Sequence, residues 1–151
     1  MSEDTPPEVN FFKTHSHAQI PQYATAGAAG MDLCTVERFT IAPGDIKMVD
    51  TGLRIKIPEG FEGQVRPRSG LAAKHGITVI NSPGTIDSDY TGPLKVLLQN
   101  HGTEEVTFAC PDRIAQLVIA PVVQVYCFEV RSAENLGETE RGQGGFGSTG
   151  S

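Results

Sequence analysis

The stretch Leu53-Arg54-Ile55-Lys56-Ile57 alternates apolar and basic residues one by one. A period of two predicts a β-strand with one face turned to a core and the other to solvent. Similar short runs, rich in Val, Ile, Leu, Thr and Phe, lie at 39–42, 46–49, 61–65, 78–80, 94–98, 105–110, 114–120 and 122–130. Glycine (17) and proline (10) separate them at short intervals. About nine short strands joined by turns predict an all-β sandwich, barrel or jelly roll.

One short helix interrupts this pattern. Residues 70–75 favour a helix of under two turns, with Ser69 as its N-cap and Gly76 at its C-terminal end. We expect residues 1–19 to form a flexible N-terminal arm, 20–131 the β domain, and 132–151 a mobile glycine-rich lid. The sequence shows no internal repeat and no linker between two domains.

Bulk properties narrow the functional class. The chain has 151 residues, enough for one domain with its own core, and a net charge of -6. An acidic chain is not expected to bind nucleic acid through its phosphates. Three cysteines without a CxxC pair are expected to be free thiols in a reducing compartment. We expect neither a signal peptide nor a membrane span, and therefore a cytoplasmic location, or a nuclear one in a eukaryote.

The C-terminal tail comes close to two nucleotide-binding motifs. Gly142, Gly144 and Gly147 satisfy the dinucleotide pattern G-x-G-x-x-G, but no helix is expected after them to hold a pyrophosphate. In a P-loop, the position of Ser148 would be a lysine. A disordered extension is one interpretation of this tail. The other is a lid over a nucleotide, since Arg141 can pair with phosphate oxygens and nearby glycine N–H groups can approach an anion.

A second candidate phosphate site lies between the strand at 61–65 and the short helix. A helix N-terminus exposes N–H groups that bind anions, and Arg68 and Ser69 would add a positive charge and a hydroxyl there. Arg66 either joins them or points to the outer face of the strand. The structural alternative is that Arg68 forms a surface ion pair and Ser69 only caps the helix.

Residues 81–92 predict a hairpin or tight turn that carries two carboxylates and a tyrosine. The pattern begins like a calcium loop, but Leu98 stands where the loop needs a bidentate glutamate, which excludes an EF-hand. Asp89 is expected to serve turn chemistry. For Asp87, which follows Ile86, the functional interpretation is a general base for a water molecule, with Tyr90 as the wall of a sugar pocket.

Two further polar residues lie within apolar surroundings. Asp32 is expected either to cap a turn or to contact the water shell of a Mg²⁺ ion that neutralises a triphosphate. Gln116 lies between Ala115 and Leu117, so its amide needs partners there. Arg113 is expected to form a structural ion pair rather than to bind a ligand.

In combination these stretches resemble the five ordered motifs of the trimeric dUTPase family. The resemblance spans residues from about 20 to 150, and this sequence does not depart from the family's motifs at any functional position. It implies a jelly-roll-like all-β fold and a homotrimer whose three active sites are shared between subunits. The matching stretches are residues 29–33, 66–72, 81–92, 113–117 and 141–148.

The resemblance also implies residue roles in hydrolysis of dUTP to dUMP and pyrophosphate. Asp87 would activate the water that attacks the α-phosphorus, and Tyr90 would pack on deoxyribose and exclude a 2′-hydroxyl. Asp32 would contact the hydration shell of Mg²⁺. Phe146, beside Gly147, would stack over uracil. Uracil would be read by Asn81, Gly84, Thr85 and Ile86, and phosphates held by Arg68, Ser69, Gly70, Gln116, Arg141, Ser148 and Thr149.

Two alternative functions stay open at this level. A dCTP deaminase, which can be bifunctional, shares this fold but resembles the chain less, because the glycine-rich tail and the Asp87–Tyr90 hairpin belong to the hydrolase. The second alternative is a catalytically inert regulator, which binds dUTP and uses the trimer to engage another protein. The presence of a base, a phosphate cradle and a lid disfavours the regulator.

Overall fold

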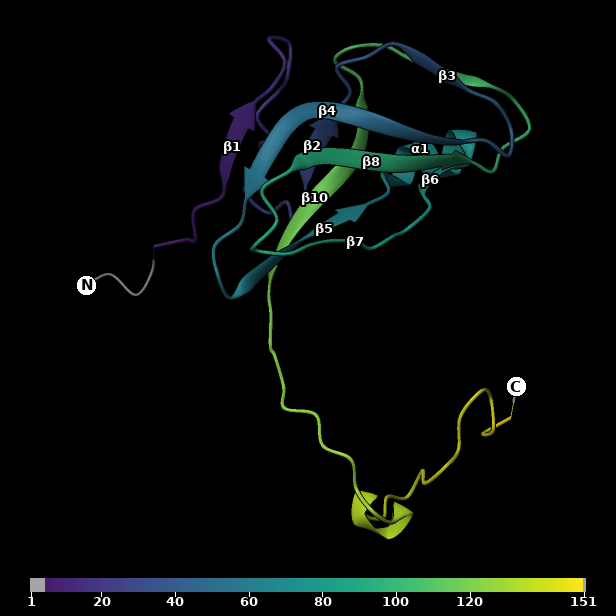
Figure 1. Cartoon of the computed structure of the whole chain (residues 1–151). Helices are drawn as coiled ribbons and strands as arrows, with labels where there is room; N and C mark the ends of the chain where they lie inside the picture. The colour runs from purple at the N-terminus through teal and green to yellow at the C-terminus, as the bar shows by residue number, and fades with distance from the viewer. Residues whose placement is uncertain (1–4, 151) are drawn as a thin grey trace.

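The computed structural model describes residues 5–150 and shows an all-β body from which the C-terminal segment departs (Figure 1). The one α-helix of the described chain is short, so the predicted fold class is confirmed. The elements are β1 (Asn10–Lys13), β2 (Met31–Cys34), β3 (Phe39–Ile41), β4 (Ile46–Lys56), β5 (Phe61–Arg66), α1 (Ser69–His75), β6 (Ile77–Val79), β7 (Gly84–Ile86), β8 (Pro93–Asn100), β9 (Val106–Phe108), β10 (Arg113–Pro121) and the 3₁₀-helix η1 (Ala133–Leu136).

The strands of residues 5–150 form two four-stranded sheets and one two-stranded sheet, all antiparallel. The first sheet has the order β1-β4-β8-β6 and the second the order β2-β10-β5-β7, while β3 pairs with β9. Strands distant in sequence are neighbours in both large sheets, so residues from the first and last thirds of the chain meet on one surface.

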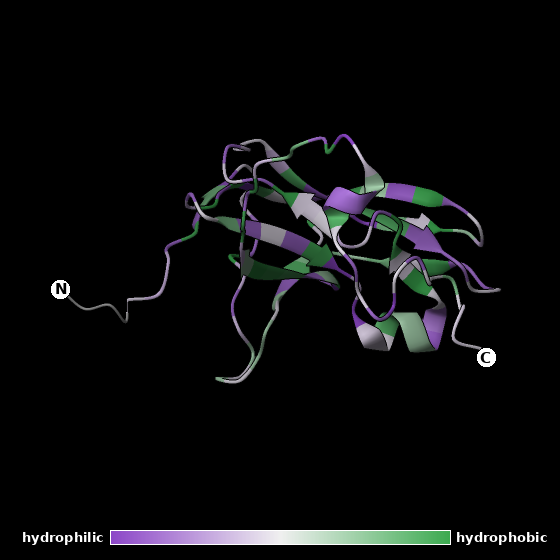
Figure 2. Cartoon of the chain, turned by 90° about the horizontal axis from the view of Figure 1, so that it is seen from below, coloured by the Kyte–Doolittle hydropathy of each residue, from purple (hydrophilic) through white to green (hydrophobic). Residues whose placement is uncertain are grey.

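The alternation along β4 behaves as its sequence predicts. Leu53 and Ile55 are buried, whereas Arg54 and Lys56 between them are exposed. The same alternation of apolar and polar residues is visible along other strands in Figure 2. Each fully buried Leu or Ile contributes roughly 1.5–3 kcal/mol through removal of its surface from water. The largest fully buried side chains are Leu33, Ile41, Leu53, Ile55, Ile57, Ile77, Leu94, Leu98, Ile114 and Leu117, with Val49 and Val96.

The runs at 46–49 and 53–57 were expected as two strands, and this expectation is wrong. They join into the single strand β4, whose pairing with β8 is irregular between Asp50 and Leu53. At this irregularity Gly52 adopts a positive φ of 70° and donates its N–H to Oδ1 of Asp50 at 2.8 Å. The local change of backbone direction is a bulge within one strand rather than a turn between two.

The strand expected at 122–130 is also absent from the described chain. Regular pairing ends at Pro121, and the N–H of Val122 donates to the carbonyl of Gly60 at 2.9 Å. Beyond that point Val123, Val125 and Tyr126 are 85%, 73% and 91% exposed. A strand needs a partner for its backbone groups, and none lies beside residues 122–130 within residues 5–150. The alternating apolar pattern is real, but one chain offers nothing to cover it.

The helix is confirmed, but its N-cap was assigned one residue too late. Arg68 is the N-cap, in extended conformation and without a capping side-chain hydrogen bond, and Ser69 is the first helical residue. Gly76 ends the helix as expected, with a φ of 68° in the left-handed region that glycine adopts without strain. Its N–H donates to the carbonyls of Leu71 and Ala72.

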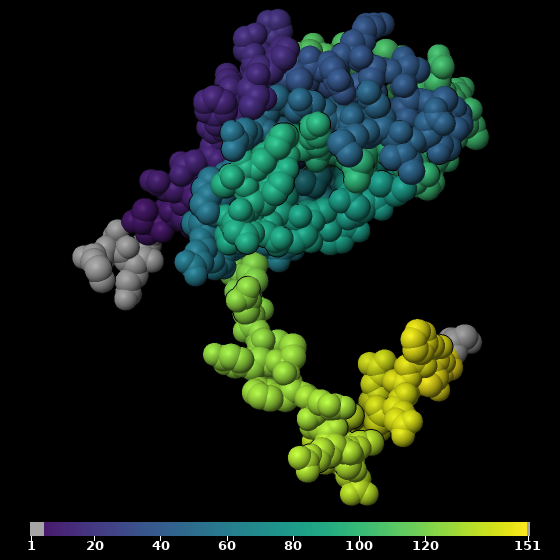
Figure 3. Space-filling view, viewed as in Figure 1, coloured from purple at the N-terminus to yellow at the C-terminus, as the bar shows by residue number. Residues whose placement is uncertain are grey.

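Both ends of the chain differ from the body. Part of the expected N-terminal arm is strand β1, which pairs with β4, and Ala18 is fully buried. The C-terminal segment, by contrast, runs away from the body as an extended chain up to η1 and then forms turns of its own outside the body (Figure 3). The domain boundaries at 19/20 and 131/132 stay predictions. In residues 5–150, neither α1 nor η1 has the length and apolar character that crossing a membrane requires.

Candidate active site

Strand β10 brings three of the predicted site segments onto one sheet. Gln116 of β10 lies opposite Asp32 of β2 on one side and opposite Arg66 of β5 on the other. Arg68 and Ser69 follow directly after β5, at the start of α1. The register of the sheet therefore assembles residues that are more than 80 positions apart in the sequence into one polar cluster.

Asp32 is the electrostatic centre of this cluster. Its Oδ1 lies 3.2 Å from Nε of Arg68, and its Oδ2 lies 3.5 Å from Nη1 of Arg113. The expectation that Arg113 forms a structural ion pair is confirmed. The Arg68 and Asp32 side chains are only 24% and 30% exposed, so this pair is better shielded from solvent than a typical surface bridge. Nη1 of Arg68 also donates to the carbonyl of Arg113 at 3.5 Å.

Gln116 finds the partner that its half-buried amide requires. Its Nε2 donates to the carbonyl of Pro67 at 2.9 Å, which ties β10 to the turn that leads into α1. Arg66 is exposed and donates from Nε and Nη2 to Oε1 of Gln64 at 3.1 and 2.6 Å. These side chains line a groove of about 480 Å³ together with Ser69, Ser82 and Pro83.

Positive charge predominates in the cluster and in the groove beside it. Arg66 lines the groove, while Arg68 and Arg113 face the single carboxylate of Asp32 in the cluster. Arg66 also bonds to Gln64, two residues before it on β5, and whether it joins the predicted phosphate site stays a prediction. The arrangement suits an anion that can accept several guanidinium hydrogen bonds at once.

The hairpin or tight turn expected at residues 81–92 is a short strand, β7, followed by a turn, and β7 does not pair with β8, which belongs to the other large sheet. We keep the name hairpin for residues 81–92. Strand β7 is held against β5, pairing Gly84 with Val65 and Ile86 with Gly63. A Cβ on Gly84 would lie 3.3 Å from Nδ2 of Asn81, so the missing side chain leaves room for that amide. Asn81 and Thr85 are exposed beside the buried Gly84 and Ile86.

Asp87 and Tyr90 follow β7 in the turn of this hairpin. The N–H of Tyr90 donates to the carbonyl of Asp87 at 3.1 Å, and its hydroxyl donates to the carbonyl of Pro93 at 2.6 Å. The tyrosine ring lies over Gly92, where a Cβ would clash with it, and the residue is 43% exposed. One face of the ring is thus packed while the residue keeps an accessible surface.

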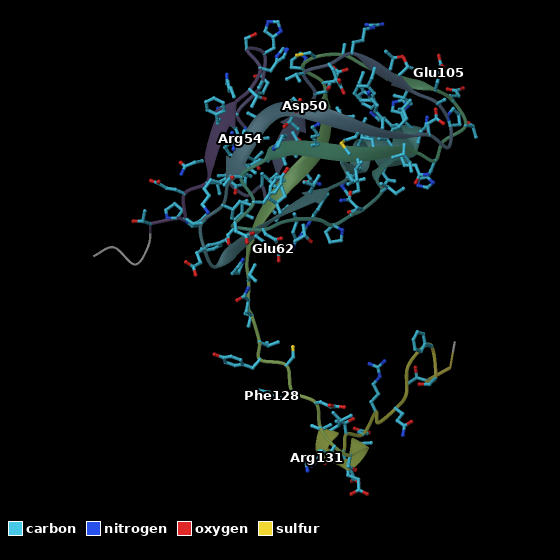
Figure 4. The ribbon with its side chains drawn as sticks, in the orientation of Figure 1. Asp50, Arg54, Glu62, Glu105, Phe128 and Arg131 are labelled. Atoms are coloured by element: carbon cyan, nitrogen blue, oxygen red, sulfur yellow. The ribbon has the colours of Figure 1, made fainter. Side chains whose placement is uncertain are left out.

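Asp87 is exposed and lies in a hollow of about 750 Å³ that is distinct from the groove. Glu59, Glu62 and Asp89 add carboxylates to this hollow, and Lys56 is the one basic residue among its lining residues in the described chain. Glu62 lies at the start of β5, near the point where the C-terminal segment leaves the body (Figure 4). One chain therefore does not bring Asp87 and the cationic groove into a single pocket.

The predicted tail residues are also apart from the groove. Phe128 and Arg131 mark the extended segment outside the body in Figure 4. The tail is organised by its own turns, with Nε of Arg141 donating to the carbonyl of Gly144 at 2.6 Å. Phe146 has a positive φ of 52° and is fully exposed, and Ser148 and Thr149 are exposed as well. Gly147 has a φ of 81°.

The donor set for a metal is sparse. Within residues 5–150, no group of three or more His, Cys, Asp or Glu side chains is placed to hold a metal ion. Both carboxylate oxygens of Asp32 already face guanidinium groups. These residues do not fit a cation coordinated by the protein alone. They fit a water-mediated contact to a cation whose ligands come from phosphate oxygens.

The three thiols are free, as expected. Cys34 follows Leu33 on β2 and is partly buried. Burial, and secondly the Asp32 carboxylate, raise the pKa of the Cys34 thiol above its ordinary value. This thiol is therefore a weak nucleophile beside the cluster.

Sequence reasoning missed residues that contact the hairpin from outside. Nζ of Lys56 donates to the carbonyl of Ser88 at 2.6 Å, and Nε of Arg54 donates to the carbonyl of Thr91 at 2.8 Å. The signal was present in the alternation of β4, where both basic residues share the outward face. It was interpreted only as the solvent side of a strand.

Comparison with known proteins gives the family. The dUTPase family model matches residues 16–150, nearly the whole chain. A protein of Anaeromyxobacter sp. named deoxyuridine 5'-triphosphate nucleotidohydrolase is 58% identical over 132 residues, which cover 87% of this chain and 88% of that protein. One of the same name from Wolinella succinogenes is 51% identical over 150 residues, 99% of each. The chain belongs to the dUTPase family.

Solved structures agree on the fold. The dUTPase of Staphylococcus bacteriophage 80alpha, in a structure with dUpNHpp, has a TM-score of 0.84 at 24% identity, covering 95% of this chain and 99% of that one. A mutant dUTPase from phage phi11 of S. aureus, described with a structural Mg(II) ion, has a TM-score of 0.78 at 22% identity, covering 84% and 99%. The likeness confirms the jelly-roll-like fold expected from the sequence.

Proposed function

We propose that this protein is a dUTP diphosphatase, which hydrolyses dUTP to dUMP and pyrophosphate. Family membership and relatives at 51–58% identity that carry the nucleotidohydrolase name support this activity. The observation that carries the proposal is the cluster of Asp32, Arg68 and Gln116, which separate segments of the chain build beside the cationic groove. Such hydrolysis removes dUTP before uracil enters DNA and supplies dUMP for thymidylate synthesis.

Asp87 is the general base in this proposal. Its carboxylate accepts a proton from water as the water oxygen bonds to the α-phosphorus, and also contacts the 3′-hydroxyl. The bond between that phosphorus and the oxygen bridging to the β-phosphorus breaks, and pyrophosphate leaves with the bridging oxygen. The exposed position of Asp87 after the paired strand β7 supports this role, because it offers a carboxylate on a held turn.

The phosphates are held by the groove and by the tail. Arg68 and Gln116 contribute a cation and an amide there, with Ser69 and Gly70 at the first turn of α1. Arg141, Gly147, Ser148 and Thr149 complete the cradle from the lid. Triphosphate hydrolysis depends mainly on positioning and on charge neutralisation, which is what such a set supplies.

Base and sugar selection reside in the hairpin. Asn81 with Gly84, Thr85 and Ile86 reads the edge of uracil through polar groups that cytosine would leave unpaired. Tyr90 packs on deoxyribose, and a ring held by its hydroxyl bond to Pro93 supports the exclusion of a 2′-hydroxyl. Phe146 stacks over the base, and its complete exposure in the described chain supports its availability for that contact.

The active sites are formed between subunits of a homotrimer. Asp87 lies in a different hollow from the cationic groove, and the lid residues lie outside the body, which supports a site completed by neighbouring copies. Each site takes the hairpin of one subunit, the groove of a second and the tail of the third. About 20 tail residues can span at most ~70 Å when extended, enough for this exchange. The tail then acts as a lid that excludes bulk water.

Magnesium is the proposed cofactor. When bound with the nucleotide, it neutralises phosphate charge and orients the chain of phosphates. Asp32 would contact the water shell of this ion. The carboxylate keeps Arg68 and Arg113 in place, and this support is independent of the ion. We predict a cytoplasmic enzyme that binds neither nucleic acid nor a membrane.

The test is pyrophosphate release with Mg²⁺, measured for the four common deoxynucleotides, dUTP and UTP. The expected result is release from dUTP and background from the others. Ammonia release from dCTP would support a deaminase instead, and binding of dUTP without pyrophosphate release would support an inert regulator. Family membership does not favour either alternative.

A further inference from the structure

The hairpin turn that carries Asp87 has no strand partner of its own. Strand β7 ends at Ile86 and β8 begins at Pro93, so within residues 5–150 no ladder pairs residues 87–92 with another element. The turn has one internal bond, from the N–H of Tyr90 to the carbonyl of Asp87, and the Tyr90 hydroxyl donates to the carbonyl of Pro93, the first residue of β8. These bonds shape the turn and tie Tyr90 to β8, but they do not involve Ser88 or Thr91.

Two basic side chains of β4 attach this turn to the body. Nζ of Lys56 donates to the carbonyl of Ser88 at 2.6 Å, and Nε of Arg54 donates to the carbonyl of Thr91 at 2.8 Å. The two carbonyls lie on either side of Asp89 and Tyr90, so the pair holds both ends of the turn. Hydrogen bonds with a charged donor are about twice as strong as neutral ones.

The strand that carries these donors is itself fixed. Arg54 and Lys56 are two residues apart and face outward, while Leu53, Ile55 and Ile57 between and beside them are at most 2% exposed. β4 is also paired on both sides, with β1 and β8, and Figure 4 shows Arg54 on the stretch of β4 beside β1. Hydrogen bonds from these donors therefore fix a loop that has no strand partner relative to the core.

From this geometry we infer that Arg54 and Lys56 are positioning residues that hold the Asp87 turn in its catalytic place. The inference rests on the proposed function, since it assigns Asp87 the role of base. Lys56 contacts the residue directly after Asp87 and lines the same hollow. Arg54 does not line that hollow, so its contribution is through the Thr91 carbonyl alone. A base displaced by about 1 Å loses on the order of a hundredfold in rate.

The experiment compares Arg54→Met and Lys56→Met with wild type. Both substitutions keep the apolar stem and remove the donor. Lys56→Arg restores a charged donor, and Lys47→Met is the matched control, because Lys47 lies on the same strand and pairs with Glu37 at 3.8 Å, away from the hairpin. The readouts are kcat and KM for dUTP, the Kd of a dUTP analogue with an imido group between the α- and β-phosphates, and the melting temperature.

We expect kcat to fall about tenfold or more in each Met variant, in line with the cost of misplacing a reacting group. The Kd for the analogue should change by no more than about threefold in Arg54→Met, with melting within about 4 °C of wild type. Lys56→Met has a weaker Kd as well, since its ammonium opposes the carboxylates of the hollow. Lys56→Arg recovers most of the rate, and Lys47→Met matches wild type.

Three results would overturn the inference: an unchanged kcat in Arg54→Met, a loss of rate matched by an equal loss of analogue affinity there, or an equal loss in Lys47→Met. Failure of the proposed function is a separate observation. In that case wild-type protein itself releases no pyrophosphate from dUTP.

Discussion

A Cβ atom on Gly30 would overlap the side-chain oxygen of Gln116. The absence of a side chain at position 30 is what lets the Gln116 amide lie where its Nε2 reaches the carbonyl of Pro67 at 2.9 Å. A small residue in one segment and an amide in another are thus a single packing unit. This unit lies beside Asp32 and holds the wall of the groove in place.

Gly30→Ala should therefore damage the site. The added methyl group displaces the Gln116 side chain, and overpacking of this kind costs about 1–3 kcal/mol of unfolding free energy. We expect a lower melting temperature and a raised KM for dUTP, measured by calorimetry and steady-state kinetics. Gly27→Ala is the control, because a Cβ there meets no atom within 4 Å. Identical behaviour of the two variants would contradict this packing argument.

Asp87→Asn should abolish turnover while binding persists. The amide cannot accept the proton of the attacking water, and loss of a general base lowers rates by about 10²–10⁴-fold. The side chain is exposed, so folding should be unaffected. Pyrophosphate release and the Kd of a non-hydrolysable dUTP analogue are the measurements. A variant that keeps more than about a tenth of the wild-type rate would remove Asp87 from the role of base.

Deletion of residues 140–151 should remove most of the rate and leave the assembly intact. The described hydrogen bonds of the tail, such as that from Arg141 to Gly144, are internal to it, so the body does not depend on them. Light scattering of the truncated protein should give the mass of a trimer. A monomeric truncation product would be inconsistent with this prediction.

Asn100→Asp should destabilise the body strongly. The side chain is fully buried, with Nδ2 donating to the carbonyls of Ile41 and Glu104 at 2.9 and 2.8 Å, and Oδ1 accepting from the N–H of Gly102 at 2.8 Å. A carboxylate loses both donations and faces two carbonyl oxygens. We expect a loss of about 3–5 kcal/mol in urea unfolding. The exposed Asn135→Asp is the control, and equal stability of both variants would refute the prediction.

Cys34 should react slowly with iodoacetamide. Its pKa is raised, first by burial and then by the Asp32 carboxylate, so the thiol form persists to higher pH and the reactive thiolate is scarce near pH 8. Mass spectrometry of each cysteine should show Cys127, which is exposed, labelled before Cys34. The rate of labelling of Cys34 should still be rising at pH values above 9.0, the ordinary pKa of a cysteine thiol. Labelling in urea should remove the difference, and equal rates in the folded protein would argue against it.

Much of the fold follows from local pattern, but pairing does not. The alternation around Ile55 predicts a strand and its buried face, and Gly76 predicts the end of the helix. Residues 46–56 form one strand because of the bulge at Gly52. The alternation of apolar and polar residues in the sequence does not reveal this bulge. Strand β7 has three residues, too few for a pattern, and exists because β5 lies beside it. Residues 122–130 show the reverse case, a pattern without a partner.

The sequence predicts which residue types form the site, but not which of these residues contact one another. The residue types of Asp32, Arg68 and Gln116 suggest phosphate chemistry from the sequence alone. That Asp32 holds two guanidinium groups follows only from the register of β2 on β10. The contacts of Arg54 and Lys56 with the hairpin likewise depend on how one edge of a sheet faces a turn, a relationship between elements that no local spacing encodes.

The exposed apolar segment after Pro121 makes the solubility of this protein depend on its concentration. Tyr126 and Phe128 project into water, 91% and 85% exposed, on a chain with no local cover in residues 5–150. Apolar surface in water is unfavourable by about 25 cal/mol per Å², and contact with a second molecule would remove this surface from water. Mass action then sets the fraction of chains in which this surface stays exposed to water. That fraction grows on dilution, whereas concentrated stocks favour contact between chains, including the wrong-register strand pairing that leads to precipitation.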